Sequence, residues 1–227
     1  MKFSETESIT PNPLFIEINK KLTGKKIVKD IKKGLFGIES NFVETNPQKV
    51  SFSADDWENP VQLLTNDKSG SAGRAKLFWT DKQNIPSGQE FFDYYKIVMS
   101  SAYPKKTITT GEPTIENVIK RMGELVEMLQ PNSAFGRSRM ALFMTKSKEE
   151  CDNFLKYIRT KFFAGLVLQE PNRSSTIGEI IPAQDYSNNS DIDWRVSIDE
   201  IDIQLYKKYN LSKIEIDFIE NKTLSVD

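Results

Sequence analysis

The stretch from Ser147 to Pro171 constrains the fold more than any other part of the chain. Its apolar residues recur at the spacing of one face of an α-helix. They are Cys151, Phe154, Leu155, Ile158, Phe162, Leu166 and Leu168. Ser147 and Glu150 have the spacing of a capping box at a helix start, and Pro171 cannot continue a helix. The pattern predicts one continuous core helix between Ser147 and Pro171.

The opposite side of this predicted helix is basic, with Lys156, Arg159 and Lys161. A charged face on a core helix is usually exposed to solvent. The alternative is a basic face that meets a polyanion. The rest of the chain must decide between these two interpretations.

The chain has no histidine and a single cysteine, Cys151. The commonest general base and the usual zinc ligands are therefore missing. One cysteine cannot form an internal disulfide, which fits a reducing cytoplasm, and we expect a cytoplasmic protein. Because Cys151 lies on the apolar stripe, we interpret it as a small core residue and not as a nucleophile.

The net charge of −1 is unevenly distributed. Residues 191–227 hold nine acidic and five basic residues, which leaves 23 acidic and 26 basic residues in the rest. A mildly basic body can bind a polyanion through a local patch. No apolar run approaches the ~18 residues of a membrane span, and the N-terminus lacks the apolar core of a signal peptide. We therefore expect no membrane partner.

Hydrophobic periodicity and turn residues predict several strands and helices. Strands are expected at 34–44, 48–53, 61–65, 74–80, 95–103 and 140–145. Helices are expected at 14–22 with an extension over 25–33, at 114–129 and at 147–171. Capping boxes at Ser197 and Ser212 predict two further short helices. The fold class predicted is α+β, with a mixed or antiparallel sheet, packed helices and a C-terminal helical tail.

Three regions follow from this pattern. Residues 1–33 are expected to form a helical lead-in, 34–190 an α+β domain, and 191–227 a two-helix tail.

Five segments, in order, resemble a known family. They are GLFGIESNF, YYKIVMSSAY, LQPNSAFGRSRMALF, FLKYIRTKFFAGLV and the stretch from IIPAQDYSNNS to DFIE. Together they resemble the target-recognition region that follows the catalytic domain in bacterial type II restriction–modification proteins with an adenine DNA methyltransferase domain. The likeness spans about residues 34–220, and its last two segments are the most specific. It implies that this region recognises a sequence in double-stranded DNA.

The catalytic half of that family has no counterpart in this sequence. No Asn/Asp-Pro-Pro-Tyr/Phe motif and no Gly-rich loop for S-adenosylmethionine are present. We therefore expect no catalytic residue, metal site or cofactor in this chain. The resemblance implies a methyltransferase domain in cis or in trans, which would use S-adenosylmethionine and, in nuclease-bearing members, magnesium. The chain is expected to be either an excised domain or a separately encoded specificity subunit.

Two loops with basic residues supply the first candidate DNA contacts. Arg137, Ser138 and Arg139 follow Phe135 and Gly136, and an arginine can read guanine O6 and N7 or clamp a phosphate. Lys105 and Lys106 suit phosphate contact. Each group has a plainer alternative, a solvated loop for the arginines and a charged hairpin loop for the lysines.

Other polar residues of the sequence are also open to more than one interpretation. Ser40 and Asn41 could read a base edge or cap a turn. Arg74 and Lys76 are interpreted as a solvated strand face. Asp185, Asp191 and Asp193 resemble a carboxylate cluster for a metal, but we interpret Asp191 and Asp193 as ordering the turn into the tail helices, near helix starts.

Three functions remain open from the sequence. The first is a DNA-recognition module that positions a methyltransferase or methyltransferase–nuclease domain. The second is a stand-alone magnesium-dependent restriction endonuclease, because Glu220-Asn221-Lys222 has the Glu-x-Lys spacing of such enzymes. The third is a protein–protein adaptor that uses the acidic tail.

Overall fold

The computed structural model describes residues 12–22, 32–67, 74–100, 114–169 and 181–220. The helices are α1 (Pro13–Leu22), α2 (Phe42–Thr45), α4 (Ile115–Leu125), α5 (Lys148–Tyr157), α6 (Lys161–Gln169), α8 (Ile198–Lys208) and α9 (Lys213–Glu220). The strands are β1 (Lys32–Lys33), β2 (Pro60–Asp67), β3 (Arg74–Asp81), β4 (Tyr95–Ser100), β5 (Glu127–Leu129), β6 (Ser133–Phe135) and β7 (Arg139–Thr145). The predicted α+β class is confirmed.

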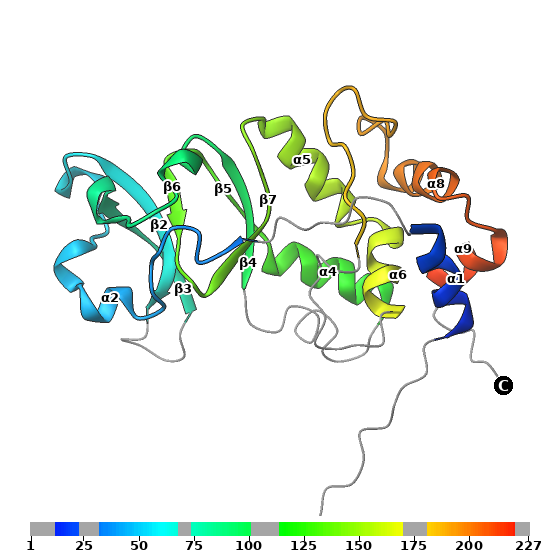
Figure 1. Cartoon of the computed structure of the whole chain (residues 1–227), viewed down its shortest axis with the longest axis horizontal. Helices are drawn as coiled ribbons and strands as arrows, with labels where there is room; N and C mark the ends of the chain where they lie inside the picture. Colours follow the sequence, from blue (N-terminus) through cyan, green and yellow to red (C-terminus); the bar gives the residue numbers. More distant parts are fainter. Residues whose placement is uncertain (1–11, 23–31, 68–73, 101–113, 170–180, 221–227) are drawn as a thin grey trace, which may run out of the picture.

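The strands form two sheets. One is antiparallel with the order β1-β7-β4-β5, and the other has the order β3-β2-β6, in which β2 and β6 are parallel. The four-stranded sheet lies between the three-stranded sheet, at the left of Figure 1 with α2, and the other helices, at its right. The described part of the chain therefore forms three layers.

Each layer boundary holds a hydrophobic core. Alternate residues of β4 and β7 point to opposite faces of their sheet, so these strands contribute to both cores. Val98 and Ala141 lie in the core between the sheets, with Phe36, Leu63 and Phe135. Ile97, Met99, Met140 and Leu142 lie in the core against the helices, with Phe154 and Phe163. Burial on both faces explains why these strands are apolar without alternation.

The predicted continuous helix from Ser147 to Pro171 is wrong: α5 ends at Tyr157 and α6 begins at Lys161. Thr160 Oγ1 accepts a hydrogen bond from Phe163 N (3.1 Å) and donates one to Tyr157 O (2.7 Å). Buried Asp202 of α8 accepts from Lys161 N (2.9 Å) and from Phe162 N (2.8 Å). These acceptors satisfy the first N–H groups of a new helix, so the chain can break here and still bury its apolar stripe.

The predicted basic face is largely contacted by the chain's own C-terminal region. Lys156 Nζ donates to Trp194 O (2.5 Å), and Lys161 Nζ lies 3.7 Å from Asp199 Oδ1. Arg159 is exposed. Cys151 is fully buried, and burial raises the pKa of its thiol to about 12, as expected for a core residue.

Burial raises the pKa of Asp202 from its ordinary value of 3.8 to about 6, against the opposing effect of its two N–H donors. Between these pH values the folded state binds more protons than the unfolded state. We therefore expect the stability of the wild type, relative to Asp202→Asn, to fall by about 3 kcal/mol as the pH rises through this window. Urea unfolding of both proteins at several pH values measures this difference. A carboxyl pKa at or below its ordinary value, measured by NMR, would contradict it.

Other elements also differ from the prediction. Residues 34–44 form a turn followed by α2 instead of a strand. Residues 48–53 contain the end of a short 3-10 helix, Pro47–Lys49, and a bridge from Ser51 to Trp79. The helix predicted to reach Leu129 ends at Leu125, because β5 pairs with β4. No strand was expected at 133–135, where the structure has β6. Residues 23–31 and 101–103 lie outside the described residues.

The Gln130–Ser133 turn links the two sheets. Asn132, at φ 59°, donates from Nδ2 to Pro60 O (2.7 Å) and from its backbone N to Phe92 O (2.7 Å). Buried Lys96 donates to Tyr94 O (2.7 Å) and Ser133 Oγ (3.2 Å), and burial lowers the pKa of its amine to about 8. The turn that carries Pro-Asn-Ser therefore has a structural role, because its hydrogen bonds hold the two sheets together.

Both predicted tail helices are confirmed. The capping boxes of Ser197 with Glu200 and of Ser212 with Glu215 are present. One core contains residues of α1, α5, α6, α8 and α9, including Ile18, Phe154, Phe162, Leu205 and Phe218. The division at residues 33 and 190 stays a prediction, and all three predicted regions contribute to this core.

Candidate nucleic-acid interface

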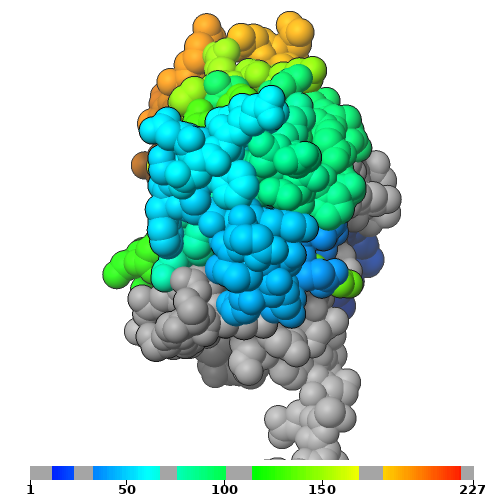
Figure 2. Space-filling model, turned by 90° about the vertical axis from the view of Figure 1, so that its left-hand side faces the viewer, coloured from blue at the N-terminus to red at the C-terminus, as the bar shows by residue number. Residues whose placement is uncertain are grey.

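The structure brings two of the predicted recognition loops together. Arg137 N donates to Ile38 O (2.8 Å), and Arg137 Nη1 donates to both carboxylate oxygens of Glu39 (2.9 and 3.0 Å). The loop with Ser40 and Asn41 therefore packs against the turn that carries Arg137. The segment around α2, which follows the loop with Ser40 and Asn41, faces the viewer in Figure 2 and is blue there.

Backbone contacts fix both loops. Gly34 and Gly37 have φ values of 65° and 67°, which glycine adopts without strain. On the other side, Gly136 N donates to Leu64 O (2.8 Å), and a Cβ at Gly136 would lie 2.4 Å from Thr65 Oγ1. The turn is thus pressed directly against β2.

The three residues of the Arg137–Arg139 turn have different environments. The Arg137 side chain is 64% exposed. Arg139 begins β7 opposite Ser100, is only 15% exposed, and lies 4.0 Å from Glu127. Burial lowers the pKa of Arg139. The Ser138 hydroxyl is buried and has no hydrogen-bond partner among the described residues. Arg137 is the one of the three that faces solvent.

Of the remaining predicted DNA contacts, the structure describes Ser40 and Asn41 but not Lys105 and Lys106. Ser40 is half-buried, and exposed Asn41 precedes α2 without making a side-chain cap. Lys105 and Lys106 lie outside the described residues. The strand that precedes them, β4, ends at Ser100 beside Arg139.

Two residues at this edge were missed from the sequence. Exposed Lys33 lies beside Met140, because β1 pairs with β7. A two-residue strand has too little pattern to be detected. Glu39 was missed because its partner Arg137 is 98 positions away.

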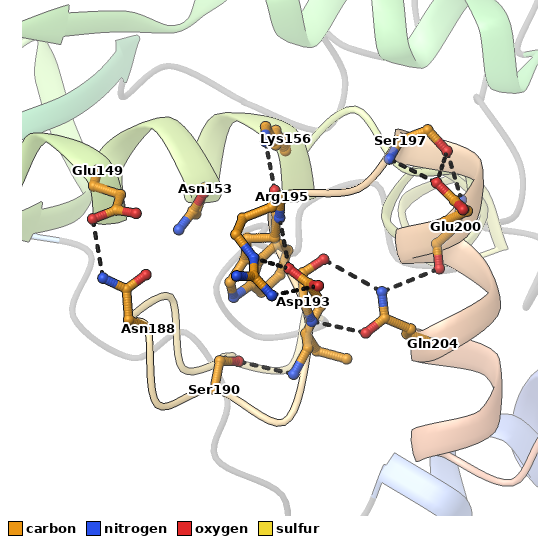
Figure 3. A network of polar contacts seen from close by, with 12 residues as sticks. Glu149, Asn153, Lys156, Asn188, Ser190, Asp193, Arg195, Ser197, Glu200 and Gln204 are labelled. Atoms are coloured by element: carbon orange, nitrogen blue, oxygen red, sulfur yellow. Dashed lines mark hydrogen bonds and ion pairs between the residues drawn. The ribbon is translucent and has the colours of Figure 1, made fainter.

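The acidic residues before α8 form a separate network, shown in Figure 3. Asp193 pairs with Arg195 (2.8 and 2.9 Å), which holds the pKa of Asp193 at about 2. Asp193 N donates to Gln204 Oε1 (2.7 Å), and Asp191 pairs with Lys208 (2.7 Å). These contacts order the turn into α8, as predicted.

Among the described residues, no group of three or more potential ligands could hold a metal ion. Glu220 accepts a hydrogen bond from Tyr206 Oη (3.0 Å), while Asn221 and Lys222 lie outside those residues. Within the same ranges, no helix is long and apolar enough to cross a bilayer. No family model, curated protein or solved structure matches the chain.

Proposed function

We propose that this chain recognises a specific site in double-stranded DNA and positions an adenine methyltransferase or methyltransferase–nuclease domain there. One observation carries the proposal. Two loops predicted to contact DNA, one with Ser40 and Asn41 and the other with Arg137, are about 98 residues apart in the sequence and are hydrogen-bonded to each other. Recognition residues characteristically lie on loops held by a rigid scaffold, and the two sheets supply such a scaffold.

The side chains at this edge suit DNA. The exposed Arg137 guanidinium can donate to guanine O6 and N7 or to a phosphate. Asn41 can pair with adenine N6 and N7, and Ser40 can accept or donate at a base edge. Lys33, with Lys105 and Lys106, would contact phosphates. The catalytic domain would bring S-adenosylmethionine and, where it cleaves, magnesium.

The first test is duplex binding by the wild-type chain, measured by fluorescence anisotropy. We expect affinity to fall at least tenfold between about 50 and about 200 mM salt, because phosphate contacts release counterions. Added magnesium should produce no cleavage. Cleavage that is lost in Glu220→Gln would favour the endonuclease instead, and no affinity at low salt would favour the adaptor.

Arg137→Gln tests the site itself. We expect about a tenfold loss of affinity for the preferred duplex, because a bidentate arginine–guanine contact is lost. Arg195→Gln is the matched control, because Arg195 is also exposed and also pairs with a carboxylate. Equal effects of the two substitutions would contradict the proposed interface.

A further inference from the structure

Glu39 is an acidic residue in a surface proposed to face a polyanion. Its backbone is fixed, because Ile38 beside it is buried and Phe42 N donates to Glu39 O (3.1 Å). Its carboxylate receives the Arg137 guanidinium through both oxygens. The two side chains are 59% and 64% exposed, so the ion pair lies at the surface.

The stability of the folded state does not account for the Glu39–Arg137 ion pair. Exposed ion pairs contribute little to stability, since water screens the charges and two long side chains must be held. In binding, by contrast, a carboxylate beside the contacting arginine has a definite effect. It repels any phosphate that approaches the guanidinium.

We infer that Glu39 is a specificity-determining residue, which directs Arg137 to a guanine–cytosine pair and opposes its contact with phosphate. The inference rests on the proposed function. A phosphate binding Arg137 must either displace Glu39 or lie beside its negative charge. A guanine presents the neutral acceptors O6 and N7, and the paired cytosine presents an N4 amino group that Glu39 can accept from.

The acid thus adds a repulsive element against one ligand and a hydrogen-bond acceptor for another. Discrimination commonly needs both. The ligand expected at this edge is a G·C pair read from the major groove.

Glu39→Gln tests this role, with Glu17→Gln as control. Glu17 is 57% exposed and pairs with Lys20 at 2.7 Å, so both substitutions remove one negative charge from a similarly exposed ion pair. Glu17 lies on α1, at the opposite end of the molecule from α2 in Figure 1. Binding to a random-sequence duplex should strengthen roughly fivefold in Glu39→Gln and change little in Glu17→Gln.

Selection from a randomised duplex library gives the second readout. The wild type should enrich a motif with a fixed G·C pair, and Glu39→Gln should relax that position alone. An unchanged motif together with unchanged random-duplex affinity would overturn the inference while leaving the proposed function intact. A wild type without duplex affinity would overturn both.

Thermal unfolding separates a structural role from this one. The midpoints of Glu39→Gln and Glu39→Ala should match that of Glu17→Gln. A clearly lower midpoint for both Glu39 variants would make the pair structural and would also overturn the inference.

Discussion

Asp202→Ala is expected to lower the free energy of unfolding by about 3 kcal/mol at neutral pH, because two N–H donors at the start of α6 lose their acceptor. Asp202 is 2% exposed and bonds Lys161 N and Phe162 N at 2.9 and 2.8 Å. Water cannot readily replace an acceptor at a buried helix start. Ionisation of Asp202 is itself disfavoured by burial, yet leaving both donors unpaired costs more.

Urea unfolding measures this loss, with Asp217→Ala as control. Asp217 is also an aspartate of a tail helix, but it is 42% exposed and pairs with Lys213, at 2.5 Å. Its removal should cost less than about 1 kcal/mol. Equal losses in the two variants would show that the cap on α6 contributes nothing beyond a surface charge.

The contact of Asp202 with the start of α6 also explains why the break between α5 and α6 could not be predicted from the sequence. The apolar stripe predicted between Ser147 and Pro171 lies on α5 and α6, and most of its side chains are buried. The break between the two helices, at Ile158–Thr160, depends on the acceptor Asp202, which is about 40 residues away in the sequence. Likewise, β5 forms because β4 offers it a partner. Local signals predicted β2, β3, β4, β7 and the tail helices, since alternation and capping boxes lie within a few residues.

In the candidate site, too, some features could be predicted from local sequence and others could not. Arg137 could be chosen from its residue type, its loop position and the family resemblance, because an arginine can read guanine or clamp a phosphate. Its carboxylate partner Glu39 could not, since no local pattern joins residues so far apart. The low exposure of Arg139 could not be predicted either, because this residue begins β7 opposite Ser100 of β4 and lies 4.0 Å from Glu127 of β5.

Gly165→Ala should destabilise the protein by about 1–3 kcal/mol, because α6 and α9 approach too closely for a methyl group. A Cβ at Gly165 would lie 2.4 Å from Ile219 Cγ2 and 2.8 Å from Ile219 O. The side chain could rotate away, but the backbone oxygen moves only if α9 moves. Gly123→Ala is the matched control, because this glycine lies in α4 and no atom of the described residues beyond its own helix backbone and chain neighbours lies within 4 Å of its Cβ position.

Gly123→Ala should stabilise by about 0.5–1 kcal/mol through helix propensity, so the two glycine substitutions are expected to have opposite signs in urea unfolding. Amide hydrogen exchange then locates the effect of Gly165→Ala. Because α9 shares its core with α1 and α6, exchange should accelerate in all three helices. Acceleration confined to α9 would mean that this helix opens on its own, and stabilisation by both substitutions would contradict the close contact at Gly165.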